Sequence, residues 1–105
     1  MSDPAVVSAR VDWAEGRRRF DHDVRDRQRA EPLHRQLEAV SGEIRRRLGD
    51  TYTLAELAAL YADSEQWARV AVGGCTVAGG PGESLAFVVD AAFQLASINA
   101  IDYVP

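Results

Sequence analysis

Residues 85–98, LAFVVDAAFQLASI, constrain the fold most, because they form a helical pattern with almost no polar face. Ser84 can cap this helix, which is expected to end near Asn99. Helical spacing leaves a single polar stripe, made of Glu83, Ala86, Asp90, Gln94 and Ser97. We expect Asp90 to face water as part of this polar stripe. The wide apolar remainder must be covered, either by the rest of the chain or by a second chain.

A second helix is predicted for residues 32–49, PLHRQLEAVSGEIRRRLG. Its apolar residues recur at steps of four, three, four and four, as in a coiled coil, at Leu33, Leu37, Val40, Ile44 and Leu48. Pro32 suits the first turn of a helix, and Gly49 suits the position just after its end. Gly42 lies off the stripe and costs about 1 kcal/mol relative to alanine.

The chain before Pro32 is densely charged. Residues 1–10 show no periodicity and are expected to be a loose tail. Residues 11–31 are expected to form a charged helical arm opening near Asp12, supported by pairs such as Arg17 with Asp21. Each such pair adds only about 0.2–0.5 kcal/mol. This arm is expected to project from a compact helical domain spanning residues 32–105.

Residues 53–72, TLAELAALYADSEQWARVAV, predict two short helices joined by a tight turn. Thr53 and Glu56 form a capping box at the first helix, and Asp63 or Ser64 can cap the second. A glycine-rich loop is expected over residues 73–83. The fold prediction is therefore an all-α bundle of four to five helices with a long charged N-terminal helix.

The hairpin at residues 53–72 resembles the helix-turn-helix of DNA-binding regulators, over about a fifth of the chain. Its charge opposes that function, because residues 50–72 hold four acids and one arginine, and phosphate neutralisation dominates nucleic-acid affinity. A nucleic-acid-binding regulator is nevertheless kept as the alternative function. Its contacts would come from Arg45, Arg46, Arg47, Gln66 and Arg69.

Sites for catalysis, metals and cofactors find little support. His22 and His34 lack further ligands at metal-binding spacing, and Cys75 lacks a positioned base. The glycines near residue 80 lack the Gly-Lys-Ser/Thr ending of a phosphate loop. We therefore expect no enzyme activity, no cofactor, no metal and no small-molecule substrate.

The composition bears on the environment of the chain. No apolar run approaches the roughly 20 residues of a membrane span, and the N-terminus lacks the pattern of a secretory signal. With a single cysteine, this favours a cytoplasmic location. All 12 basic residues are arginine, which is typical of a bacterial genome of high GC content.

These observations favour a non-catalytic protein-interaction or regulatory module that acts through apolar helix faces. The partner is expected to be another protein or a second copy in a homodimer, with no membrane contact. The residues expected to bind it come from the coiled-coil stripe, the hairpin and the last helix: Leu33, Leu37, Val40, Ile44, Trp67, Phe87 and Phe93.

Overall fold

A computed structural model describes residues 4–73 and 82–101 of the chain. These ranges contain helices and no strand, which confirms the predicted small all-α bundle. The elements are α1 (Pro4–Asp23), α2 (Arg27–Leu48), α3 (Leu54–Tyr61), α4 (Ser64–Ala71) and α5 (Gly82–Ile98). None of these helices combines the length and the apolar character needed to cross a bilayer.

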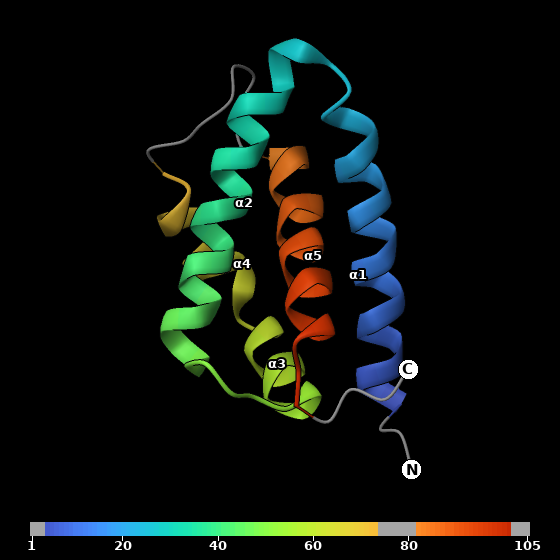
Figure 1. Cartoon of the computed structure of the whole chain (residues 1–105), viewed down its shortest axis with the longest axis vertical. Coiled ribbons are helices and arrows are strands. Elements are labelled where there is room, and N and C mark those ends of the chain that lie inside the picture. Colours follow the sequence, from blue (N-terminus) through green and yellow to red (C-terminus); the bar gives the residue numbers. More distant parts are fainter. Residues whose placement is uncertain (1–3, 74–81, 102–105) are drawn as a thin grey trace.

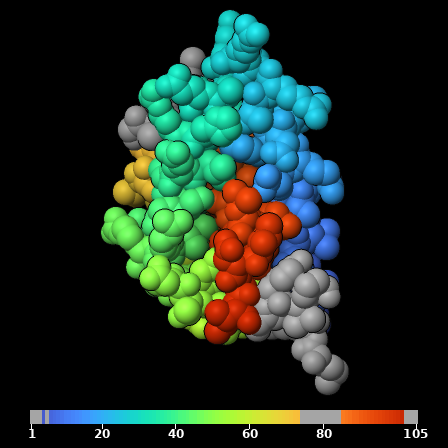
Figure 2. Space-filling model, in the orientation of Figure 1, coloured from blue at the N-terminus to red at the C-terminus, as the bar shows by residue number. Residues whose placement is uncertain are grey.

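Helix α5 is the central element of the bundle. It lies between α1 and α2 (Figure 1), and all four other helices contact it. Its side chains Val88, Ala91 and Phe93 have no exposed surface. On the face shown in Figure 2, α5 is visible between α1 and α2 mainly in its C-terminal half. The wide apolar face of this helix is therefore covered by its own chain.

Helices α1 and α5 make the most extensive contact in the bundle and run antiparallel. Trp13 packs on Phe93 with ring centroids 5.4 Å apart, and the Arg19 guanidinium lies 5.4 Å from the centroid of the Phe87 ring. Between these two contacts, Gly16 faces Asp90. Moving three residues forward along α1 therefore moves the contact three residues back along α5, as expected for antiparallel helices.

The close approach at Gly16 corrects the expectation that Asp90 simply faces water. A Cβ atom at position 16 would lie 2.2 Å from the Asp90 Cβ, so only glycine lets the helices meet there. Asp90 is half-buried, and Ser97 of the same polar stripe is buried. The polar stripe is therefore partly covered, and at Asp90 the cover is Gly16 of α1.

The predicted N-terminal boundaries were also wrong. The helix begins at Pro4 instead of near Asp12, so residues 4–10 are not a loose tail, and residues 1–3 lie outside the described ranges. It does not project as an arm over residues 11–31, because Trp13 and Phe20 are buried in the core.

The break between the first two helices falls before Arg27 instead of at Pro32. The Asp26 carboxylate caps α2 by accepting a hydrogen bond from the Gln28 backbone N–H at 2.9 Å. Pro32 lies inside α2, where it removes one backbone hydrogen bond. Leu33, buried directly after it, keeps this turn against the core.

Two predicted helix ends are confirmed. Gly49 ends α2 with a φ of 81°, which favours glycine, and donates its N–H to the Arg45 carbonyl at 2.8 Å. Thr53 caps α3 by accepting from the Glu56 N–H at 3.1 Å. The predicted loop at 73–83 falls largely outside the described ranges, and its last residues, from Gly82, belong to α5.

Two helical glycines provide a matched test of this packing. Gly42→Ala meets no atom within 4 Å of the new Cβ, so we expect the free energy of unfolding to rise by about 0.5–1 kcal/mol. Gly16→Ala must push α1 away from α5, so we expect it to fall by about 1–3 kcal/mol. Urea unfolding of both variants measures the difference, and equal effects of the two substitutions would contradict the α1–α5 contact.

Candidate functional site: a groove between α4 and α5

The residues expected to bind a partner lie mainly in the core of the chain itself. Leu37 is partly buried against the core. The other six side chains are buried: Leu33, Val40, Ile44, Trp67, Phe87 and Phe93. These side chains contact the helices of their own chain. A surface that binds a partner would therefore consist of other side chains.

The residues of the nucleic-acid alternative lie on α2 and α4. Arg46 and Arg47 both pair with Glu43, at 3.4 and 2.9 Å. The Arg47 guanidinium lies 5.2 Å from the centroid of the Trp67 ring, which brings this one arginine against α4. Arg45 is exposed and lines a separate hollow beside Tyr52.

The exposed face of α4 carries little net charge. Arg69 pairs with Glu65 at 2.7 Å, and Gln66 is exposed beside them. Val70 completes this face and is 82% exposed. Because Arg69 is paired, the helix that would read DNA in the alternative function presents no excess of positive charge, and that alternative stays a prediction.

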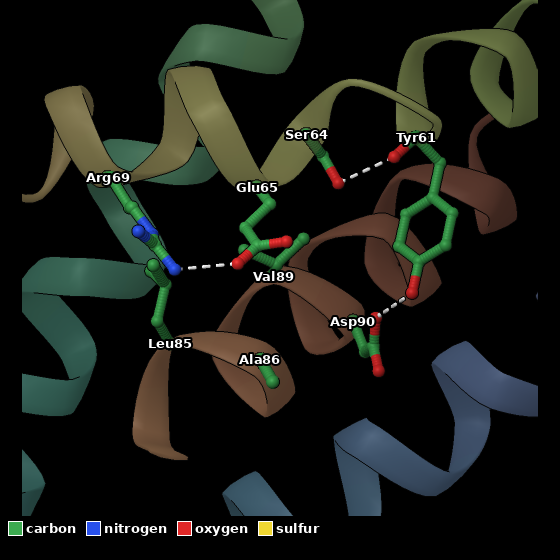
Figure 3. Close-up of a pocket in the computed structure, with 8 residues that line it drawn as sticks. All are labelled: Tyr61, Ser64, Glu65, Arg69, Leu85, Ala86, Val89 and Asp90. Atoms are coloured by element: carbon green, nitrogen blue, oxygen red, sulfur yellow. Dashed lines mark hydrogen bonds and ion pairs between the residues drawn. The ribbon is translucent and has the colours of Figure 1, made fainter. Parts of the chain in front are cut away.

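A groove of about 490 Å³ lies between α4 and α5 and is open to solvent along one side. Figure 3 shows its lining, which comes from the end of α3, one side of α4 and the first half of α5. The lining residues are Tyr61, Ser64, Glu65, Arg69, Leu85, Ala86, Val89 and Asp90. This α4–α5 groove is the candidate functional site.

The floor of the groove is apolar and its borders are polar. Leu85 and Val89, one turn apart on α5, are buried beneath it, and Ala86 is exposed beside them. The Glu65–Arg69 ion pair borders it on α4 (Figure 3). A ligand in the groove therefore meets an aliphatic surface flanked by charges.

One end of the groove is closed by a hydrogen bond between α3 and α5. The Tyr61 hydroxyl donates to the Asp90 Oδ1 at 2.6 Å (Figure 3). The Tyr61 ring is fixed by edge-on contacts with Trp13 and Phe93, at centroid distances of 5.5 and 5.1 Å. The hydroxyl is therefore held in place by packing as well as by the carboxylate.

The turn of the hairpin sets where Tyr61 stands. Tyr61 is the last residue of α3, and its backbone carbonyl accepts a hydrogen bond from the Ser64 hydroxyl at 2.7 Å. Asp63 occupies the capping position of α4 without a side-chain hydrogen bond, so the predicted cap is not formed by its carboxylate. Ser64 instead ties the start of α4 to the end of α3.

The Asp90 carboxylate is electrostatically unusual. Burial raises its pKa, the hydrogen bond from Tyr61 lowers it, and the nearby charge of Asp12 raises it again. Burial also raises the pKa of Tyr61, and so do its hydrogen bond to Asp90 and the charges of Asp90 and Asp12. Within the described residues, neither Asp90 nor Asp12 forms an ion pair with a cation.

The described lining residues of the groove carry few reactive groups. They include no histidine or cysteine, and the Ser64 hydroxyl is engaged with a backbone carbonyl instead of a base. Over residues 4–73 and 82–101, no three metal-ligating side chains come together, and Cys75 lies outside these ranges. The groove offers an apolar floor and an unpaired carboxylate.

Sequence reasoning missed the pairing of Tyr61 with Asp90. The available signal was that Asp90 is the only charged residue between Ser84 and Asn99. A lone acid in an apolar helix either faces water or has a special partner. The decisive residue is Gly16 of α1, which faces Asp90 and has no side chain to signal this contact in the sequence.

Replacing Asp90 with asparagine tests the cost of this carboxylate. The asparagine side chain can still accept a hydrogen bond from Tyr61, but it places no charge in a half-buried site. Because the folded-state pKa of Asp90 is raised, the charged carboxylate costs stability above that pKa, and the cost disappears below the ordinary value near 4. We therefore expect Asp90→Asn to unfold at a higher temperature than the wild type at pH 7, with a smaller difference at pH 4.

Thermal unfolding at the two pH values measures this effect. Glu38→Gln, which removes an exposed carboxylate from α2, serves as the control and should change stability by less than about 0.5 kcal/mol. A wild type more stable than Asp90→Asn at pH 7 would show that the carboxylate supports the fold.

Comparison with protein-family models, curated proteins and solved structures found no match to this chain. The chemistry of the groove therefore rests on its own residues. They combine an apolar floor, a bordering ion pair and a carboxylate bound to a tyrosine.

Proposed function

We propose that this protein is a non-catalytic interaction module that binds a segment of a partner protein in the α4–α5 groove. The observation that carries the proposal is the groove itself, which is open to solvent between two helices and has the apolar side chains of Leu85 and Val89 beneath it. Grooves of this form accept side chains of a partner segment, as in helix-in-groove recognition.

The open side of the groove favours a protein over a small molecule. Pockets for small ligands bury most of the ligand surface. Here one side is open, and the exposed face of α4 continues beyond the border of the groove through Gln66 and Val70. A partner segment can extend along this face, whereas a small ligand would leave much of its surface in water.

Other exposed apolar side chains support self-association less well. Val7 and Val11 lie one turn apart on α1, whereas Ile98 and Ile101 lie at and beyond the end of α5. Isolated exposed apolar residues are normal on protein surfaces, and a stable homodimer buries about 800 Å² on each copy. The α4–α5 groove is a more concentrated feature, so the partner is proposed to be a different protein.

Filling the groove tests this function. Ala86→Trp places a large ring over the floor formed by Leu85 and Val89, so we expect it to abolish binding of the partner. Ala55→Trp adds the same ring at an exposed position of α3 outside the groove and should leave binding unchanged. Tagged wild type and both variants are purified from the native cell, and the bound proteins are compared by mass spectrometry.

The expected result is a protein that copurifies with the wild type and with Ala55→Trp but not with Ala86→Trp. Circular dichroism checks that both variants remain helical. A protein retained equally by all three chains, or none retained by any, would exclude a role for the groove in protein binding.

A further inference from the structure

We propose that the α4–α5 groove selects a cationic side chain, arginine or lysine, on the partner segment, with the Asp90 carboxylate as its counter-ion. This inference rests on the proposed function and specifies the chemistry of the partner. It is carried by the charges, the free carboxylate oxygen and the apolar floor of the groove.

The charge around the groove is unbalanced toward negative. Its lining includes two carboxylates, on Glu65 and Asp90, and one cation, Arg69. That cation is bound to Glu65, so Asp90 is left without a partner of opposite charge among the described residues. Asp12 of α1 adds a further negative charge that acts on both Tyr61 and Asp90. Such a field attracts a cation and repels phosphate.

The two oxygens of the Asp90 carboxylate have different surroundings. Oδ1 accepts from Tyr61, whereas Oδ2 accepts no hydrogen bond from any described residue. Figure 3 shows Oδ2 directed away from the tyrosine, and it lies on the side of the carboxylate nearer Gly16. Oδ2 thus lies on the side of α1, and it is the carboxylate as a whole, which lines the groove, whose charge a guanidinium or ammonium group can meet with a charge-assisted hydrogen bond.

The floor suits the aliphatic part of such a side chain. Arginine and lysine lay their methylene stems along apolar surfaces and keep the charged group at a polar end. The floor runs from Leu85 to Val89 and ends beside Asp90, and four residues of helix span about 6 Å. A stem lying on this floor therefore delivers its cation to the carboxylate.

The position of Asp90 fits a carboxylate kept for binding. A half-buried carboxylate without a cation is unfavourable, and burial raises the pKa of this one. A cation from the partner would remove this cost when the complex forms, so the same residue would weaken the free protein and strengthen the bound state. Residues with such perturbed surroundings are enriched at functional sites.

Two peptides that differ only in charge test the proposal. The first is acetyl-Ala-Leu-Arg-Leu-Ala-amide, and the second replaces arginine with citrulline, which is neutral and of similar shape. The full-length protein, labelled with ¹⁵N, is titrated with each peptide at low salt. We expect the arginine peptide to shift the amide signals of Tyr61, Glu65, Ala86 and Asp90, and to bind about tenfold tighter than the citrulline peptide or more.

Variants assign the effect to Asp90. In Asp90→Asn the two peptides should bind equally, whereas Glu38→Gln, which removes an exposed acid elsewhere, should keep the preference for arginine. A lysine peptide and its norleucine counterpart should repeat the pattern. The two-peptide comparison on the wild type stands even if a variant folds poorly.

Each outcome decides the question separately from the protein-binding role. Equal binding of the charged and neutral peptides, or no shift at the groove with any peptide, overturns the cation preference. In that case loss of the partner in Ala86→Trp still supports an apolar docking groove. Preference for the charged peptides together with a partner that Ala86→Trp retains supports the cation site and removes the protein-docking role.

Discussion

The contact between Gly16 and Asp90 sets the geometry on which the rest of the structure depends. Because position 16 has no side chain, the backbone of α1 comes close to the Cβ atom of Asp90 on α5. This fixes the antiparallel register of the two helices, so that Trp13 meets Phe93 and Tyr61. The aromatic cluster then holds the end of α3 against α5, and the hairpin places α4 beside the groove.

The same contact explains why Asp90 is half-buried. Helix α1 packs against Asp90 at Gly16, while the adjacent side of α5 borders the groove toward α4. The carboxylate stands between these two sides, with one oxygen on Tyr61. Its charge is disfavoured by burial, and natural proteins tolerate such costs where a function needs them. The packing of the core helices thus determines where the groove lies.

Much of the helical architecture could be predicted from the sequence, because it rests on local chemistry. Gly49 follows the end of α2 because glycine readily adopts its positive φ, and Thr53 precedes α3 because its side chain caps the first turn. Two local signals disagreed about where α2 begins, since Pro32 favours a start at residue 32 and Asp26 can cap a helix that starts at Arg27. The helix starts after Asp26. A proline inside a helix removes one hydrogen bond and its ring crowds the carbonyl four residues earlier, a cost that a cap and a buried Leu33 can offset.

The candidate site could not be predicted in the same way, because it depends on which face of α5 meets which helix. A helix that is apolar on nearly all sides has no single direction in which it must bury itself. Its polar stripe suggested water, but a glycine on another helix made that stripe a packing surface. Gly16 lies far from Asp90 in the sequence, and its lack of a side chain gives no periodic signal. The periodic patterns in the sequence therefore predict the helices but not how the helices are oriented relative to one another.

The distribution of ion pairs explains why Asp90 has no cation among the described residues, although the chain has 12 arginines. Of the ion pairs among the described residues, all but Arg29–Asp23 join side chains three or four positions apart on one helix. Each of these arginines is engaged where it stands. On α1, Arg19 lies over the Phe87 ring, about one turn of α5 from Asp90. These local pairs supply no cation to Asp90 among the described residues, which agrees with the proposal that a partner supplies one.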